Sequence, residues 1–484
     1  MSWHTKARLV TAAAVLATGA GLVGPVALSS AGPPPIVRPA APVPALAPAP
    51  PLRLLSSVRK SPRLTELQFS TPYLDGPTGV RILTPVGYGD DPHKRWPVLW
   101  LLHGIYTKNT GVGTVDDLEG GGPGYAQWTR YCDAEALTRP GKFLVVMPEA
   151  GIGQYTDNYG IAGEGGPAWE SYHLRQLLPW VDAHYRTIPT RAERAVAGLS
   201  MGGGGAMRYA ARHPDLFGYA SSYSGAVDPD DGQPLVGARA TDINQALMPI
   251  GDGTTPPESA FGPWATEEIR TRAHDAVDLD GNLRHTVLVL RSADGTDGNG
   301  VITSPDEWGV YKQTVNLHEA LDRAGIPHTY EDSGPGSHDW PRFEDDLKRD
   351  IAPLNAFFAS GAGTVPASFS YTWAELRGDD FGYRITSDRG FLEFATIHVS
   401  ADRLLVSGSG VFTITTAGRY VPGAVYRLTA TRNATTQQTV VRADHEGRLS
   451  FAADTGVRST GQQYRPDPGL VTVIDQVQLT IRRA

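Results

Sequence analysis

Cysteine is nearly absent from this chain, which contains a single residue of this type, Cys132, among 484. One cysteine cannot form an intrachain disulfide, so the fold must rest on its hydrophobic core. Cys132 lies in a half-apolar, helix-like stretch, which indicates a buried small hydrophobe rather than a nucleophile. Basic residues are also in the minority: 43 Lys and Arg stand against 51 Asp and Glu, a formal net charge of -8. This balance argues against nucleic acid as a main partner.

The chain is long enough for more than one domain, because 484 residues with 40% hydrophobic residues can bury a large core. At its start, basic residues precede an apolar run and small residues that end at Ala31. This order predicts a secretory signal peptide over residues 1–31, cleaved near Ala31, and therefore a secreted protein. An uncleaved membrane anchor is the alternative, which glycines and a proline within the run disfavour. Residues 32–62 are rich in Pro and Ala, which predicts an extended linker.

The rest of the chain shows two different patterns of apolar residues, one after the other. Over residues 63–361, continuous apolar runs alternate with amphipathic helical patterns, which predicts a mostly parallel sheet with helices on both faces. From residue 366 to 484 apolar residues alternate with polar ones, as at Val477, Leu479 and Ile481. Turn signals recur between these runs, and no long helix is expected there. The predicted fold class is therefore α/β, followed by a small all-β sandwich.

A single serine, Ser200, lies among glycines in the stretch GLSMGGGGAMRYAARHP at residues 198–214. An apolar strand pattern precedes it and a helical pattern stopped by Pro214 follows it, so the glycines occupy a strand-to-helix turn. Gly198, Ser200 and Gly202 fit the nucleophile elbow G-x-S-x-G, in which a sharp turn exposes the serine at a helix N-terminus. A phosphate-binding loop is excluded because no Gly-Lys-Ser/Thr follows. Ser200 is the candidate nucleophile, and a merely connecting Gly-rich loop is the alternative.

A nucleophilic serine needs a base and an acid, which hydrolases of this build carry in the order Ser, acid, His. His338 satisfies this order, because it lies in a loop between a strand pattern and the final helix of the α/β region. Asp297 is the economical choice of acid, a few residues past a strand on a Gly-flanked turn, and Glu307 is the second candidate. The same loop lacks the ligand spacing of a calcium loop. We expect no metal and no cofactor.

The negative charge that forms during acyl transfer needs backbone N–H donors. In this type of site, one donor is the residue after the nucleophile, here Met201, and another lies in the loop after an early strand. Ile105 is the candidate for the second donor, because it follows the apolar strand pattern that ends at His103 and Gly104. We interpret His103 as a structural imidazole that braces this turn.

These motifs resemble the esterase D and antigen 85 branch of the α/β-hydrolases. The similar stretches include residues 97–104, 147–159, 194–225 and 334–343, and the likeness extends over roughly residues 65 to 360. The resemblance implies that Ser200 and His338 are nucleophile and base and that Met201 and Ile105 form the oxyanion hole. For the acid it leaves two patterns open, because many relatives use an Asp in a G-T-x-D loop and antigen 85 proteins use a Glu at the start of the next helix.

The resemblance implies a serine carboxylic-ester hydrolase that forms an acyl-enzyme on Ser200 and takes a small ester. An acyltransferase of the mycolyltransferase type, using the same triad, is the main alternative. A non-catalytic adhesive protein with a hydrolase-like fold is a third reading, which the intact serine and histidine disfavour. A polysaccharide or a cell-envelope surface is the candidate partner of the C-terminal sandwich.

Overall fold

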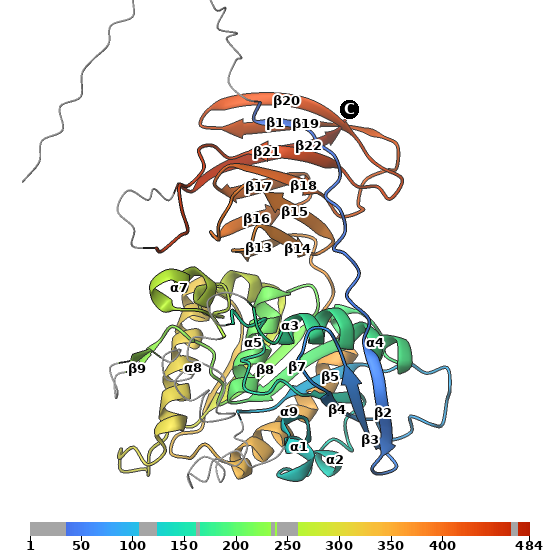
Figure 1. Cartoon of the computed structure of the whole chain (residues 1–484), viewed down its shortest axis with the longest axis vertical. Coiled ribbons are helices and arrows are strands. Elements are labelled where there is room, and N and C mark those ends of the chain that lie inside the picture. The colour runs from blue at the N-terminus through green and yellow to red at the C-terminus, as the bar shows by residue number, and fades with distance from the viewer. Residues whose placement is uncertain (1–34, 106–122, 161–164, 234–237, 240–259, 466–472) are drawn as a thin grey trace, which may run out of the picture. The chain divides into compact units, whose positions relative to one another are not determined.

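The computed structural model describes residues 35–105, 123–160, 165–233, 238–239, 260–465 and 473–484. The predicted signal peptide, residues 1–31, lies outside this range. Residues Ile36–Ala484 form one compact unit (Figure 1). Among the residues that the structure describes, no helix is both long enough and apolar enough to cross a membrane.

A nine-stranded sheet organises the first part of this unit, in the order β12-β11-β8-β7-β5-β6-β4-β3-β2. The strands β12, β11, β8, β7, β5 and β6 run parallel, whereas β4, β3 and β2 continue the sheet antiparallel. The bounds are β2 (Arg53–Arg59), β3 (Leu64–Ser70), β4 (Thr78–Leu83), β5 (Val98–Leu102), β6 (Leu144–Pro148), β7 (Arg194–Leu199), β8 (Tyr219–Tyr223), β11 (Val287–Ser292) and β12 (Thr329–Asp332). Every residue of β5, β6, β7 and β8 is buried, as expected for parallel strands covered on both faces.

Helices cover both faces of this sheet, which confirms the predicted α/β class. Successive residues of β5 point to opposite faces, so that Trp100 belongs to one core cluster and Leu101 to the other. Helices α4, α5 and α8 contribute to the first cluster, and α1, α2 and α9 to the second. The helical bounds are η1 (Gly124–Ala126), α1 (Gln127–Arg130), α2 (Ala134–Leu137), α3 (Trp169–Ser171), the π-helix η3 (Tyr172–Leu177), α4 (Leu178–His184), η4 (Arg191–Glu193), α5 (Met201–Arg212), α7 (Trp264–Arg272), η5 (Asp280–His285), α8 (Pro305–Ala324) and α9 (Trp340–Ser360).

Two antiparallel sheets make up the C-terminal part, as the alternating sequence pattern predicts. One has the order β1-β21-β18-β15-β14 and the other β13-β16-β17-β22-β19-β20. Side chains of both sheets, such as Phe412 and Leu479, meet in one hydrophobic core. The bounds are β13 (Phe369–Trp373), β14 (Arg377–Asp380), β15 (Tyr383–Ser387), β16 (Ala395–Val399), β17 (Arg403–Gly408), β18 (Val411–Thr415), β19 (Val425–Arg432), β20 (Thr435–Arg442), β21 (Ser450–Asp454) and β22 (Asp475–Arg483). A small separate ribbon pairs β9 (Gly232–Gln233) with β10 (Ala238–Arg239).

The segment interpreted from its composition as a linker contains two paired strands. Strand β1 (Val37–Pro39) pairs antiparallel with β21, and Ile36 and Val37 are buried in the core of the C-terminal sheets. Strand β2 pairs with β3 at the edge of the nine-stranded sheet. The interpretation as an extended tether missed both pairings, because the Pro and Ala content hid the buried residues Ile36 and Val37, and β2 pairs with β3 through its backbone while all of its residues stay exposed. The domain boundaries proposed from the sequence stay a prediction.

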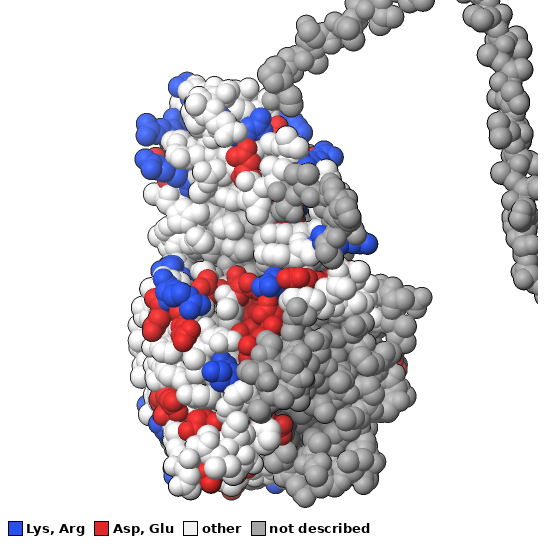
Figure 2. Space-filling model, turned by 90° about the vertical axis from the view of Figure 1, so that its left-hand side faces the viewer, with Lys and Arg blue, Asp and Glu red and all other residues white. Residues whose placement is uncertain are grey.

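Polar contacts connect the C-terminal sheets to the helices around the elbow. The Asn282 side chain donates to Thr372 O and accepts from Thr372 N, both at 2.8 Å. At the C-terminal end of α5, Arg212 forms ion pairs with Glu170 at 3.1 Å and with Glu375 at 2.8 Å. On the face drawn in Figure 2, Asp and Glu side chains gather in the middle of the view and Lys and Arg side chains lie mainly above them. The C-terminal end of the helix that follows Ser200 is thus connected to the C-terminal sheets.

Candidate active site

Ser200 occupies the turn between β7 and α5, as the G-x-S-x-G motif predicts. Its backbone has φ +52° and ψ -122°, a combination that residues with a side chain rarely adopt. Three hydrogen bonds hold this strained backbone: Ser200 N–H donates to Tyr223 O at 2.9 Å, and Ser200 O accepts from Ala226 N at 3.0 Å and from Gly204 N at 3.1 Å. The geometry is that of a nucleophile elbow.

Close packing explains the glycines on either side of the serine. A Cβ atom at Gly202 would lie 2.5 Å from His103 O and 2.6 Å from Leu102 O. A Cβ atom at Gly198 would lie 2.5 Å from the backbone of Gly202. Such distances are far below van der Waals contact, so only glycine lets the first turn of α5 approach the end of β5.

The predicted oxyanion donors lie on the two segments that this packing brings together. Met201 is the first residue of α5, and the first N–H groups of a helix have no partner within that helix. Ile105 follows His103 by two residues, in the turn that Gly202 contacts, and packs against the core. Their role in holding an oxyanion stays a prediction.

A buried carboxylate holds the predicted base. The distance from His338 Nδ1 to Glu307 Oε2 is 2.7 Å, and the two side chains are 3% and 0% exposed. The other oxygen, Glu307 Oε1, accepts from Ser224 Oγ at 2.7 Å, Ser292 Oγ at 3.1 Å and Ala293 N at 2.7 Å. A neutral imidazole that donates from Nδ1 keeps Nε2 as a proton acceptor.

The pKa of Glu307 reflects this environment. Burial alone raises the pKa, but the hydrogen bond and charge of His338, together with the bonds from Ser224 and Ala293, outweigh burial. The pKa of Glu307 is therefore held below its ordinary value. Near neutral pH the residue is an ionised, fixed acceptor, which is what orients an imidazole and stabilises its protonated form.

Asp297, the first choice of acid from the sequence, does not contact His338 among the described residues. Its side chain is exposed and closes its own turn, accepting from Asn299 N at 2.9 Å and from Val301 N at 3.2 Å. The backbone hydrogen bond from Asn299 lowers the pKa of Asp297. Asp in a Gly-containing loop commonly bonds to its own backbone in this way. The partner of His338 is therefore corrected from Asp297 to Glu307, the second candidate.

Strand order brings the serine close to the acid and histidine. Ser200 N–H bonds to the last residue of β8, Tyr223, and the next residue, Ser224, bonds to Glu307. Ser224 has a positive φ of 48°, and its N–H donates to Arg291 O in β11 at 2.7 Å. The candidate groups thus gather at the carboxyl ends of the neighbouring parallel strands β7, β8 and β11, where α/β sheets place their sites.

His103 contacts the turn that it was expected to brace. Its Nε2 accepts from Ala150 N at 2.9 Å, its Nδ1 lies 2.6 Å from Gly104 O, and its own carbonyl accepts from Tyr155 OH at 2.9 Å. The ring is 1% exposed. These contacts fix the backbone that leads to Ile105.

Another buried histidine, His173, escaped the sequence analysis. It lies in the π-helix η3, 2.8 Å from Tyr209 OH through Nδ1 and 2.9 Å from Glu149 O through Nε2. Burial lowers the pKa of His173 to about 3, so the ring is neutral. Its sequence context reads as an ordinary amphipathic helix. A π-helical turn cannot be recognised from hydrophobic periodicity. The aromatic residues around His173 were the one sequence feature that could have drawn attention to it.

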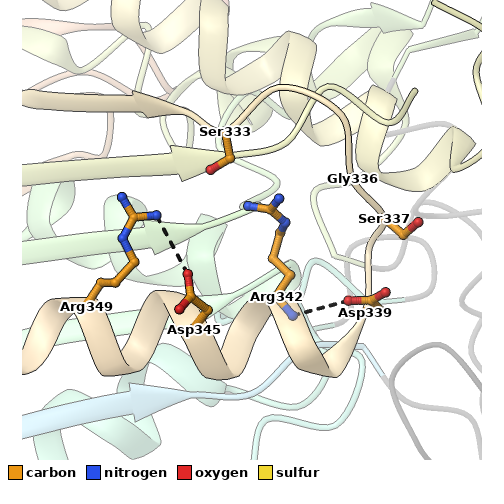
Figure 3. Close-up of a pocket in the computed structure, with 7 residues that line it drawn as sticks. All are labelled: Ser333, Gly336, Ser337, Asp339, Arg342, Asp345 and Arg349. Carbon is orange, nitrogen blue, oxygen red and sulfur yellow. Dashed lines mark hydrogen bonds and ion pairs between the residues drawn. The ribbon is translucent and has the colours of Figure 1, made fainter. Parts of the chain in front are cut away.

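A polar pocket lies beside the loop that carries His338 (Figure 3). Its volume is about 430 Å³, and its lining residues are Ser333, Gly336, Ser337, Asp339, Arg342, Asp345 and Arg349. Figure 3 shows Arg342 and Arg349 extending from α9 towards Ser333, with Arg349 3.8 Å from Asp345. Neither Ser200, Glu307 nor His338 lines this pocket. It is adjacent to the candidate active site and distinct from it.

A protein-family model described as "Putative esterase" matches residues 71–354. This chain belongs to that esterase family. The match spans the nine-stranded sheet from β4 onwards together with Ser200, Glu307 and His338. It confirms the resemblance drawn from the sequence and, together with the sheet and helices described above, the predicted α/β-hydrolase fold.

Two curated proteins illustrate what this chain is similar to. It is 30% identical over 287 residues to Esterase Rv1288 of Mycobacterium tuberculosis, an alignment that covers 59% of this chain and 58% of the relative. It is 25% identical over 284 residues to the diacylglycerol acyltransferase/mycolyltransferase Ag85A of Mycobacterium gordonae, covering 56% and 76%. The chain thus spans only about 58% of the length of the first of these relatives.

The solved structures that this chain is similar to include MPT51 (FbpC1) of Mycobacterium tuberculosis, with a TM-score of 0.47 and 18% identity over 60% of this chain and 96% of that one. An S-formylglutathione hydrolase (FrmB) of Staphylococcus aureus has a TM-score of 0.42 and 19% identity, covering 63% and 99%.

Proposed function

We propose that this esterase is a secreted serine carboxylic-ester hydrolase that works through an acyl-enzyme on Ser200. The observation that carries the proposal is the buried hydrogen bond of 2.7 Å between Glu307 and His338. The end of strand β8 connects this pair to the strained elbow at Ser200, through the bonds of Tyr223 and Ser224 described above. Strain of this kind is retained where surrounding contacts and function require it. The secreted location rests on the sequence pattern of residues 1–31.

The proposed reaction assigns one step to each group. His338 Nε2 takes the hydroxyl proton as Ser200 Oγ attacks the ester carbonyl, and Glu307 stays ionised and stabilises the imidazolium. The N–H groups of Met201 and Ile105 hold the oxyanion, where one donor contributes on the order of 100-fold to 1,000-fold in turnover. His338 then protonates the leaving alcohol, and water, activated by the same imidazole, releases the acid.

An acyltransferase is the second candidate, and the position of the acid favours it. Glu307 lies in the first turn of α8, which is the antigen 85 pattern, and Ag85A is among the relatives. In that case the acyl group passes from Ser200 to the hydroxyl of an alcohol or a sugar instead of to water. A small ester or acyl donor is the substrate in both cases. A polysaccharide or a cell-envelope surface stays the proposed partner of the C-terminal sheets.

The test is labelling of the full chain with a serine-directed phosphonate, combined with turnover of p-nitrophenyl esters of graded chain length. We expect label on Ser200 alone, no turnover in Ser200→Ala, and unchanged turnover in the control Ser337→Ala, whose side chain is exposed beside the polar pocket. Adding glycerol or a sugar separates the two candidates, since only an acyltransferase forms the acylated acceptor in excess over free acid. Substantial turnover by a clean Ser200→Ala preparation would refute the proposal.

A further inference from the structure

Residues 202–205, the glycine run that opens α5, pack against a second segment besides the end of β5. A Cβ atom at Gly203 would lie 2.7 Å from the Cα of Gly225. A Cβ atom at Gly204 would overlap the carbonyl oxygen of Ala226. The first turn of α5 and the segment that follows β8 are therefore in direct backbone contact, which only residues without a side chain allow.

The same segment is bonded to the backbone of the elbow on both sides of one serine, Ser224. Before it, Tyr223 O accepts from Ser200 N at 2.9 Å, and after it, Ala226 N donates to Ser200 O at 3.0 Å. Ser224 itself has a positive φ of 48°, and its N–H donates to Arg291 O at 2.7 Å. A residue with a side chain adopts such a conformation at a cost, so these contacts must hold it there.

The hydroxyl of Ser224 bonds to the carboxylate that holds His338. Ser224 Oγ donates to Glu307 Oε1 at 2.7 Å, and both residues are 0% exposed. Glu307 Oε1 also accepts from Ser292 Oγ at 3.1 Å and from Ala293 N at 2.7 Å. The other oxygen, Oε2, lies 2.7 Å from His338 Nδ1. The carboxylate can therefore turn away from the imidazole only by breaking buried hydrogen bonds, of which that from Ser224 is the shorter of the two side-chain bonds to Oε1.

We propose that Ser224 is a positioning residue for ester turnover, whose hydroxyl holds Glu307 in the orientation that His338 requires. Its strained backbone fixes this carboxylate relative to the nucleophile elbow. The inference rests on the proposed function, in which His338 takes the proton of the nucleophilic serine. Hydrogen bonds to an ionised carboxylate are stronger than those between neutral groups, so loss of this donor leaves the carboxylate less well oriented and more basic.

The charged groups around Glu307 set the direction of the expected pH effect. His338 faces one of its oxygens, and the buried Asp346 of α9 is near enough for the two negative charges to oppose each other, while the charge of Arg342 favours ionised Asp346. Burial raises the pKa of Glu307, and the hydrogen bonds from His338 and Ser224 lower it. Without the Ser224 donor, a more basic carboxylate stabilises the protonated imidazole beside it, and this imidazole then loses its proton at a higher pH.

The test compares two variants of Ser224 in the full chain. Ser224→Ala removes the hydroxyl and keeps the Cβ atom, whereas Ser224→Gly also removes the cost of the positive φ. In both variants we expect kcat for a p-nitrophenyl ester to fall about 10-fold to 100-fold with little change in KM. The acidic limb of the pH–rate profile should move to higher pH.

The matched control is Ser221→Ala. It removes another buried hydroxyl of β8, one without a hydrogen-bond partner within the described part of the chain, and should leave kcat and the pH profile unchanged. Circular dichroism checks the fold of each variant. If Ser224→Ala fails to fold, Ser224→Gly still decides, because glycine accepts the positive φ without strain.

Proton NMR of the chain without substrate separates this inference from the proposed function. A proton held between an imidazole nitrogen and a buried carboxylate resonates at unusually low field, and His338→Ala should remove this signal. We expect the signal to shift or broaden in both Ser224 variants and to stay unchanged in Ser221→Ala. Absence of ester turnover in the wild-type chain would refute the proposed function, and the NMR comparison would still decide whether Ser224 positions Glu307.

Three results would overturn the assignment. The first is a low-field signal, kcat and pH profile in both Ser224 variants that match those of the wild-type chain. The second is wild-type turnover in Ser224→Gly alone, which would assign the loss in Ser224→Ala to backbone strain. The third is an equal loss in Ser221→Ala, which would assign the effect to packing within β8.

Discussion

Two buried acidic groups lie at neighbouring strand ends of this molecule and differ in how they are satisfied. Glu307 lies next to His338 and accepts hydrogen bonds on both of its oxygens, and its pKa is lowered despite burial. Asp228 and Asp275 are as deeply buried, yet their carboxyl groups face each other, and burial together with the neighbouring acidic charges raises their pKa values. Burial alone therefore does not decide the state of a carboxyl group. The number of donors and positive charges that face it does.

The largest expected effect concerns the satisfied side of this comparison. Glu307→Gln keeps the shape of the side chain but removes its charge and lets an amide N–H face His338 Nδ1, which favours the wrong tautomer. We expect turnover of a p-nitrophenyl ester to fall by about 10⁴-fold, with an unchanged circular dichroism spectrum. A loss smaller than about tenfold, or about 1.4 kcal/mol in barrier, would place the functional acid elsewhere.

A second satisfied carboxylate, Asp350, tests stability instead of catalysis. It is 0% exposed and accepts from Tyr223 OH at 2.7 Å and from Arg291 at 3.0 Å. Asp350→Ala leaves a buried guanidinium short of one partner, so we expect a loss of about 3 kcal/mol or more in the free energy of unfolding. Urea denaturation measures it, with the exposed Asp345→Ala as control. By contrast, Asp275→Asn should cost little stability, because burial and the neighbouring carboxyl groups already disfavour its charge, and an equal cost at both positions would remove the distinction drawn above.

The pH dependence of stability sharpens the same comparison. Burial raises the pKa of Glu170, but the charge of Arg212 and the hydrogen bond from His213 outweigh it, so the folded pKa lies well below the unfolded value near 4.5. A lowered carboxyl pKa stabilises the fold above about pH 4.5, and that contribution disappears as the pH falls further, by about 1.4 kcal/mol per pH unit for each group. Unfolding free energies from pH 7 to pH 3 should therefore fall less steeply in Glu170→Gln. Parallel curves for the two proteins would contradict this assignment.

The smallest expected effect belongs to an exposed carboxylate. Asp297 bonds only to its own turn, so Asp297→Asn should change ester turnover and stability by less than about 0.5 kcal/mol, or about twofold. Steady-state kinetics beside Glu307→Gln gives the ranking directly. A loss of 100-fold in Asp297→Asn would restore the aspartate pattern.

Local motifs allowed part of the site to be predicted from the sequence. Ser200 and His338 stand in stretches whose neighbours fix their backbone, a glycine elbow and a loop before the last helix of the sheet. The sequence does not identify the acid in this way. Both Asp297 and Glu307 follow β11 closely, and from the sequence alone either side chain could face His338. Only the fold shows that the first turn of α8 points Glu307 inward. Asp228 and Asp275 could not be joined at all, since they lie far apart in the sequence and only the fold brings their carboxyl groups together.

Composition was a good guide to whole regions and a poor one to short segments. Continuous apolar runs and strict alternation identify the parallel sheet and the C-terminal antiparallel sheets, because burial on two faces or one sets the period. Strands β1 and β2 were missed because pairing with a partner strand, β21 or β3, stabilises each of them, and this pairing is not evident from their own residues.

The pairing of β1 with β21 also constrains the order in which parts of the chain can fold. Val37–Pro39 leaves the ribosome early, whereas its partner at Ser450–Asp454 is among the last segments to be made. The nine-stranded sheet, whose last strand ends at Asp332, can assemble during this interval. Bringing two such distant strands together is slow, because the chain between them loses conformational entropy before strand pairing compensates for that loss. We therefore expect β1 to stay accessible to proteases and processing enzymes throughout synthesis, and to become protected only when the C-terminal sheets close over it.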